Sequence, residues 1–298
     1  MEAVPVLQAA SAALLNACFA WLVGTVLARR WLAAAGASGR AIEASLRRYD
    51  VLAAGLGTLA GVAALWAATA VMGGVDLIEA RTMFWLMVTT TDHGHAGCIT
   101  IAALFAVCLL RVRLSPGSLR EPLVLAALAI FAVTRASMGH AGEDGWWSAA
   151  MASESLHLVA IGVWAGVVFV SGSAVVGAVG IGLSLSGTGR YLEAMSHAAT
   201  VAVVVIVATG LFNAWQRIGT PANLSHGLYA GAFLVKIALV GVALLLGAYN
   251  KFTGLRRASK SVQAVQGIKF VLLAESVLLL GVLIAAAVMT SQQPPAAM

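Results

Sequence analysis

The sequence predicts an all-α fold, a polytopic membrane helix bundle with about eight transmembrane helices. Of the 298 residues, 61% are hydrophobic and only 10% are Asp, Glu, Lys or Arg, whereas soluble domains average about 25% charged residues. The mean hydropathy is +0.94, and long apolar runs recur along the whole chain. These observations argue against a soluble enzyme, a disordered chain and a disulfide scaffold.

A membrane-spanning helix needs about 20 mainly apolar residues. The chain offers eight such stretches, at residues 6–28, 51–73, 94–112, 121–138, 154–176, 195–215, 228–250 and 269–290. Backbone groups in lipid must find partners within their own segment, so we expect helices here and not barrel strands. The stretch 121–138 is the weakest, because it is short and contains Arg135. Together the spans predict a single transmembrane domain over residues 1–298.

Basic residues gather in alternate connections between these spans. Fourteen Lys and Arg residues lie in the connections 29–50, 111–120, 177–194 and 251–269. The remaining connections hold only Arg81 and Arg217. Cytoplasmic connections are rich in Lys and Arg, so the first set is predicted to face the cytoplasm. With an even number of spans, both termini are then expected on the opposite, outer side.

The net charge, the first residues of the chain and one short apolar stretch fit this arrangement. The net charge of +6 follows from the orientation signal, so we expect the lipid bilayer as a partner and no nucleic acid. The chain opens Met1-Glu2-Ala3 without a basic segment, so the first apolar run is expected to be a retained span. The stretch Thr82 to Val88, which contains Trp85, is typical of a short interfacial helix.

Histidines collect on the predicted outer side. Of the six histidines, only His197 is expected near the cytoplasmic side. Neutral imidazole is the commonest protein metal ligand, and it suits copper, while thioethers favour Cu(I). We therefore predict a site for a copper ion, as Cu(I) or Cu(II), on this side. The best candidate ligands are His140, His157, His93 and His95, and the weaker ones are Met138, Glu154 and His226.

Polar residues within the spans add a candidate path toward the cytoplasm. Glu154 and His157 are three residues apart, so they share one helix face, and Trp164 continues that face seven residues later. Asn213 and Lys236 lie inside the sixth and seventh spans. Such residues line a pathway or bind neighbouring helices together, and the sequence leaves both interpretations open.

Several short motifs from residue 139 onward resemble one known family. They are Gly139-His140-Ala141, the run Ser155–Gly166 (SLHLVAIGVWAG), the run Thr209–Trp215 (TGLFNAW), and the later residues Tyr229, Lys236, Asn250, Glu275 and Pro294. Their order and spacing are similar to those of the copper resistance protein D (CopD) family, whose signature reads LHLLAAALWLGG at the second of these sites. The resemblance is densest over residues 135–290. Departures include Ala230, where the family tends to have Gly, and the His-rich Asp92–His95.

The resemblance implies a bacterial inner-membrane (plasma membrane) protein of eight helices that handles copper and is usually considered an importer. In this orientation both termini are periplasmic. Family members are often paired with, or fused to, a periplasmic copper carrier of the CopC type. The sequence contains no such β-sandwich domain, so a separate carrier is expected as the partner.

Two other classes of function stay open from the sequence. In the first, the chain is a haem b membrane cytochrome in electron transfer or metal reduction, with histidines as axial ligands. In the second, it is a structural or assembly subunit with incidental histidines. The sequence contains no Walker A motif, aspartyl-phosphate motif or apparent nucleophile–base pair, so we expect no enzyme. Transport direction, copper oxidation state, energy source and oligomeric state stay undetermined.

Overall fold

The computed structural model describes residues 3–37, 40–115, 117, 119–176, 183–218, 228–255 and 261–291. The regular elements within these ranges are helices, which confirms the predicted all-α class. They are α1 (Ala3–Ala34), α2 (Arg40–Gly73), α3 (Ala80–Thr90), α4 (Asp92–Arg113), α5 (Arg120–Ser137), η1 (His140–Gly142), α6 (Ala149–Val170), η2 (Ser171–Val175), α7 (Leu185–Ile218), α8 (Leu228–Tyr249), η5 (Asn250–Gly254) and α10 (Val262–Thr290).

Seven of the described helices are long and apolar enough to cross a membrane. The one predicted span outside these seven, residues 121–138, corresponds to α5, which carries Arg120, Glu121 and Arg135 within only 18 residues. One face of α5 is nevertheless buried, through Val124, Leu128 and Phe131. Packing against its neighbours α4 and α6 therefore keeps α5 inside the bundle. The chain is a multi-pass membrane protein.

The ends of the helices differ from the sequence expectation on one side of the bundle. Residues 29–50 and 111–120 were expected to be connections, but α1 continues to Ala34, α2 begins at Arg40 and α4 continues to Arg113. The reason is that the charged residues in these stretches are paired with one another, as described below. Because they are paired, these charged residues can lie on packed helices. A count of charges alone predicts that such residues lie in solvent-exposed connections.

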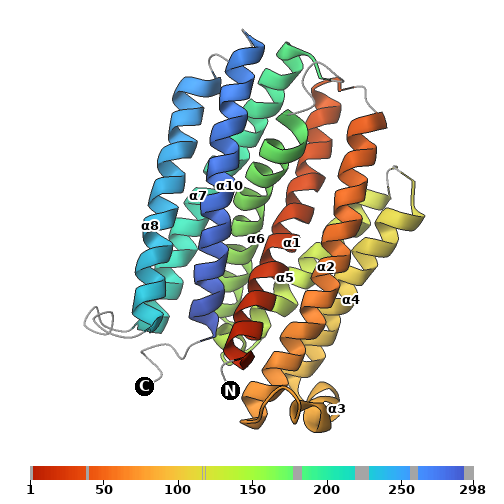
Figure 1. The fold of residues 1–298 in the computed structure, drawn as a ribbon, viewed down its shortest axis with the longest axis vertical. Coiled ribbons are helices and arrows are strands. Elements are labelled where there is room, and N and C mark those ends of the chain that lie inside the picture. Colours follow the sequence, from red (N-terminus) through yellow and green to blue (C-terminus); the bar gives the residue numbers. More distant parts are fainter. Residues whose placement is uncertain are drawn as a thin grey trace.

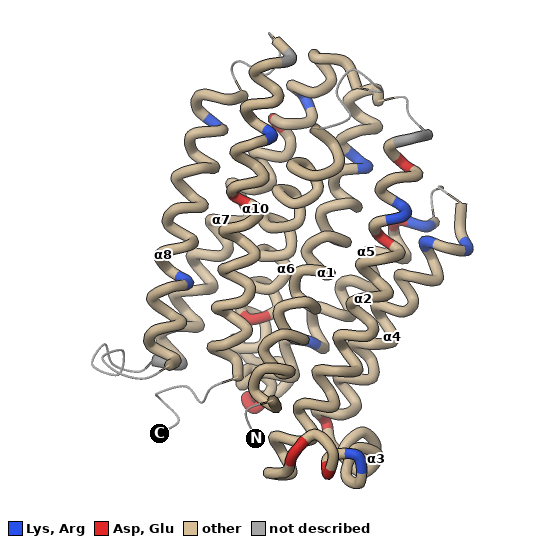
Figure 2. The backbone as a smooth tube through the Cα atoms, in the orientation of Figure 1, with Lys and Arg blue, Asp and Glu red and all other residues tan. Residues whose placement is uncertain are grey.

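The long helices run alternately up and down, so the start of α1 and the end of α10 lie at the same end of the bundle as α3 (Figure 1). We call this the outer end, and the opposite one the inner end. Figure 2 shows most Lys and Arg residues in the inner half. This distribution agrees with the alternation of basic connections in the sequence.

Two hydrophobic cores share helix α1. One core joins α1 to α2, α4 and α5, with Phe19, Leu104 and Phe131 at its centre. The other joins α1 and the start of α2 to α6, α7, α8 and α10, with Trp164 and Leu272 among its members. Helix α1 therefore links the two halves of the bundle.

Helices α1 and α6 meet through small residues. A Cβ atom added to Gly24 of α1 would overlap the backbone of Gly166, and one added to Gly166 would overlap the backbone of Ala20. One turn earlier on α6, a Cβ on Gly162 would lie 2.6 Å from the Phe19 ring. Small residues at four-residue spacing are what lets membrane helices approach this closely. We call this contact the α1–α6 seam.

Helix α3 lies at the outer end, next to α2 and α4 (Figure 1). It is a short helix over the expected stretch, and its Trp85 is 73% exposed. Just before it, the Asp76 carboxylate accepts hydrogen bonds from the backbone N–H groups of Ile78 and Glu79, both at 2.8 Å. These bonds lower the pKa of Asp76 below its ordinary value, because they stabilise the ionised carboxylate.

Candidate functional site

Five polar side chains meet between α6 and α7 near the outer end of the bundle. Ser153, Glu154 and His157 belong to α6, and Thr209 and Asn213 belong to α7. We call this group the outer polar cluster. Three of the five, Glu154, His157 and Asn213, are residues that the sequence selected. Ser153 and Thr209 were not among its candidate site residues.

Helical spacing explains how each helix contributes to the cluster. Residues three and four positions apart share a helix face, which places Ser153 and His157 together on α6, with Glu154 beside them. The same spacing joins Thr209 and Asn213 on α7. Close approach of α7 is possible because position 210 is Gly, where a Cβ would already lie 3.4 Å from the His157 ring.

The amide of Asn213 is held from both sides. Ser153 Oγ donates a hydrogen bond to Asn213 Oδ1 at 2.8 Å, and Asn213 Nδ2 donates to Glu154 Oε2 at 3.0 Å. These two bonds define which way the amide points. The Glu154 carboxylate is thereby fixed against α7.

The hydrogen bonds of Thr209 define the protonation pattern of His157. Thr209 has a single hydroxyl proton, and its Oγ1 lies 2.6 Å from the Val205 carbonyl oxygen, to which it donates. Its Oγ1 also lies 2.8 Å from His157 Nδ1. We assign Thr209 as the acceptor of this second bond because its proton goes to the Val205 carbonyl; Nδ1 then carries the proton and Nε2 the lone pair. Metal-binding imidazoles usually donate the other ring N–H to a carboxylate, a backbone carbonyl or water, and here the Thr209 hydroxyl takes the place of that acceptor.

Trp164 lies two helical turns further in, and it belongs to a different contact. Its indole N–H donates a 3.1 Å hydrogen bond to Glu275 Oε1 of α10. Both residues are buried, at 5% and 2% exposure. The expected continuation of the Glu154 and His157 face therefore ends at an acidic residue in the middle of the bundle.

His93 has a positively charged neighbour. It is half-buried in the first turn of α4, and Arg135 of α5 is close enough to interact electrostatically with both His93 and Glu154. A guanidinium group repels a metal cation that lies near it. Arg135 therefore opposes copper binding at His93, and it also acts on the Glu154 carboxylate of the outer polar cluster.

The other candidate ligands at the outer end are dispersed. His95 is exposed, and its Nε2 lies 3.1 Å from the Thr89 carbonyl oxygen. His140 is exposed in η1, with Nδ1 3.1 Å from Glu143 Oε1. Met138 is half-buried and receives a 3.8 Å contact from the Thr100 hydroxyl to its sulfur. Each of these side chains is held by a local partner from its own part of the chain or from α4.

Lys236 and His226 are the two remaining candidate site residues. Lys236 is half-buried on α8. His226 lies outside the residues that the structure describes. Within the described ranges, no group of three or more His, Cys, Asp or Glu side chains is arranged to hold a metal ion. The outer polar cluster brings two of the candidate ligands, Glu154 and His157, into one hydrogen-bonded group.

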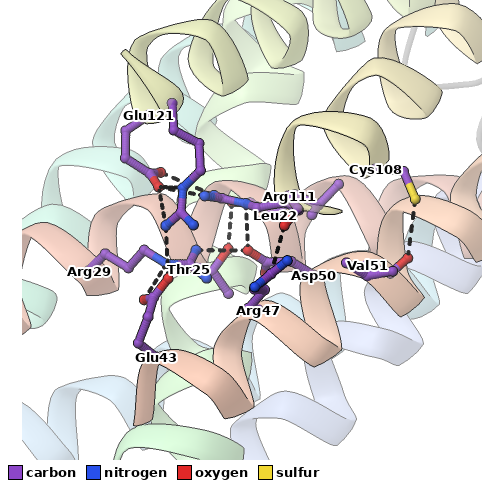
Figure 3. A network of polar contacts seen from close by, with 11 residues as sticks. Leu22, Thr25, Arg29, Glu43, Arg47, Asp50, Val51, Cys108, Arg111 and Glu121 are labelled. Atoms are coloured by element: carbon purple, nitrogen blue, oxygen red, sulfur yellow. Dashed lines mark hydrogen bonds and ion pairs between the residues drawn. The ribbon is translucent and has the colours of Figure 1, made fainter. Parts of the chain in front are cut away.

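Sequence analysis missed a second polar site, at the inner end, which we call the inner ionic network (Figure 3). Arg29 of α1 contacts Asp50 of α2 at 2.7 Å, and Arg111 of α4 contacts the same carboxylate at 2.8 Å. Asp50 and Arg111 have fully buried side chains. A buried charge is tolerated only when it is paired, and here each is.

The network extends to α5 and closes on itself. Glu121 binds both Arg111 and Arg120, and Glu43 binds both Arg29 and Arg120. In addition, Arg47 donates to the carbonyl oxygens of Arg111 and Val112 at the end of α4. The seven-residue spacing of Glu43 and Asp50 was the available sequence signal, because it places both acids on one face of a helix.

The geometry also bears on the haem b alternative. His197 is exposed on α7, twelve residues from Thr209, which contacts His157. Twelve residues correspond to about 18 Å along a helix. His157 and His197 are therefore too far apart to bind the two faces of one haem.

Two family models match the chain. Residues 1–150 match the model described as the N-terminal domain of copper resistance protein D-like proteins, and residues 188–289 match the model described as copper resistance protein D. Neither description supports a haem protein. The run Ser155–Gly166 lies between the two matched ranges. No significant match was found among curated proteins or solved structures.

Proposed function

The chain belongs to the copper resistance protein D family, and from this premise we propose that it binds copper at the periplasmic face of the inner membrane and carries it across. One observation supports the position of the copper site. In the outer polar cluster, the lone pair of His157 Nε2 is defined by Thr209, beside the carboxylate of Glu154. Imidazole nitrogen and carboxylate oxygen are suitable copper ligands.

We assign His157 as the principal ligand and Glu154 as the second. His140 and His95 are exposed at the same end, where they could first contact incoming copper, together with His93, Met138 and His226. Asn213, Trp164 and Lys236 would then follow on the inward path. We assign the chain no catalytic reaction, and copper is its substrate.

The ligand assignment is tested by the copper content of the purified protein. We expect His157→Ala to lower the bound copper per chain, and the pair His140→Ala with His157→Ala to lower it further. His197→Ala is the matched control, because this histidine is exposed on α7 away from the cluster. Unchanged copper stoichiometry in the double variant would contradict the assignment.

Transport needs a separate measurement. Cells that express the chain should accumulate more copper at a controlled external concentration than cells without it, and the His157→Ala chain should not restore the difference. Lower accumulation in expressing cells would reverse the proposed direction. Equal accumulation at every copper concentration would overturn transport, while leaving copper binding to be judged by the stoichiometry.

We propose that copper arrives from a separate periplasmic carrier of the CopC type. The support is chemical: His95 and His140 are exposed at the outer end, and Trp146 and Trp147, shortly after His140 in the chain, are exposed as well. The test incubates a copper-loaded carrier with the chain in lipid nanodiscs and measures copper on each protein after separation. Electron paramagnetic resonance of the product then identifies the oxidation state, because Cu(II) is paramagnetic and Cu(I) is not.

A further inference from the structure

A cavity of about 250 Å³ lies between α6, α7, α8 and α10. It is distinct from the outer polar cluster. Trp164 and Glu275 line it near the middle of the bundle, and Thr200 and Lys251, both exposed, line it as well. Since a water molecule occupies about 30 Å³ in the liquid, several could fit. The cavity thus connects a buried carboxyl group to the surface on the side of Lys251.

Glu275 is the acidic residue in this cavity. It lies thirteen residues after the start of α10, or roughly 20 Å along the helix. One of its oxygens accepts the hydrogen bond from Trp164, and within the described ranges it forms no ion pair. Ionisable residues within membrane helices are costly to bury, and they are most often functional.

Asn250 gives a second, independent sign of a ligand. It lines the same cavity and is 5% exposed, yet both its Oδ1 and its Nδ2 lack a hydrogen-bond partner among the described residues. It begins the π-helical turn η5, a distortion frequently found at functional sites. A buried amide without partners is unfavourable unless something in the cavity, such as water, bonds to it.

The lining favours a proton over a metal ion. Calcium takes six to eight oxygen ligands and magnesium needs about six, whereas the side chains of this cavity offer one carboxylate, one amide, the hydroxyls of Ser196 and Thr200 and the Met195 thioether in a mainly apolar wall. The ammonium group of Lys251 lines it too, bonded to Thr200 Oγ1 at 2.8 Å. A proton, by contrast, needs only the carboxylate and a chain of water molecules. We propose that Glu275 is a proton-binding site that exchanges with water in this cavity.

Few other charged groups face Glu275. Lys251 is the cationic residue in the described lining, while Glu193 and His197 of α7 and Lys269 of α10 do not line the cavity. On protonation, the carboxylate oxygen takes H⁺ from hydronium and releases one water molecule. In a copper carrier this proton would offset the charge of the moving metal. That last statement rests on the proposed function, whereas proton binding does not.

Dicyclohexylcarbodiimide tests the site in the purified, copper-free chain. The reagent adds to a protonated carboxyl group in an apolar environment; the acid proton moves to nitrogen, and the adduct rearranges to a stable N-acylurea that peptide mass spectrometry locates. We expect an adduct at Glu275 whose yield falls at least tenfold as the pH rises. The yield at each pH is corrected with an added carboxylic acid standard.

A pair of glycine variants tests access through the cavity. A Cβ at Gly247 would lie 3.4 Å from Glu275 Oε1, whereas one at Gly241, on the same helix, meets no atom within 4 Å. Gly247→Leu should therefore slow labelling at least fivefold, and Gly241→Leu should leave it unchanged. Both variants are compared only after they elute as the parent chain does in size-exclusion chromatography.

Three outcomes would overturn the proton site. They are no adduct at Glu275 in the folded chain when the denatured chain is labelled, a yield that does not change with pH, and equal labelling of the two glycine variants. None of these readouts uses copper. A chain that labels as expected but accumulates no copper would therefore refute the proposed function and leave the proton site standing.

Discussion

The inner ionic network and the outer polar cluster both place polar side chains inside a membrane bundle, but they differ in charge balance. The network joins three Arg and three acidic residues from four helices, and every one contacts an opposite charge. The cluster joins two helices through hydrogen bonds and contains one acidic residue and one imidazole. Complete pairing stabilises helices against each other, whereas an imidazole beside a carboxylate brings together two groups of the kinds that bind metal cations.

The largest expected effect is on stability, at the network. Asp50→Ala leaves Arg29 and Arg111 without their shared carboxylate, and breaking a buried pair costs about 3–5 kcal/mol. We expect the free energy of unfolding in detergent to fall by about that amount. Arg48→Ala is the control, because Arg48 is exposed on the same helix. If the two variants unfold alike, the network does not hold the inner end together.

An intermediate effect is expected on copper affinity, at the cluster. Thr209→Val removes the hydroxyl that defines the His157 tautomer, and loss of such a partner typically weakens metal binding about 10- to 100-fold. Thr209→Ser keeps the hydroxyl and should bind copper as the parent chain does. The measurement is a copper titration of both purified variants. Equal affinities would show that Thr209 does not orient the ligand.

The smallest effect is expected at the edge of the cluster. Ser153→Ala removes one hydrogen bond to Asn213, and such a bond contributes about 0.5–1.5 kcal/mol. We expect a slight loss of stability and a change in copper affinity of less than about fivefold. Thermal unfolding and copper titration of this variant measure both. A loss of binding as large as that of Thr209→Val would mean that Ser153, through Asn213 and Glu154, also controls the ligand.

The sequence predicted the helices well because each long apolar run has only one way to satisfy its backbone in lipid. It also predicted that Glu154 and His157 share a face, since that depends only on helical spacing. Their contact with α7 confirms the shared face. These features follow from residues close together in the chain.

The network could not be predicted in the same way. Arg29, Asp50, Arg111 and Glu121 are up to ninety-two positions apart, and nothing local shows that their helices adjoin. A charge count therefore assigned the arginines to solvent-facing connections. The Trp164–Glu275 hydrogen bond spans 111 positions and depends likewise on which helices are neighbours in the bundle.

The α1–α6 seam constrains how the protein can change shape. Because the two backbones are in contact at Gly24 and Gly166, neither helix can tilt or slide past the other without steric overlap. Helix α8, by contrast, has only Ala230 and Ala243 buried among its described residues. A motion that alternated access between the two membrane faces would therefore keep α1 and α6 together as one rigid pair.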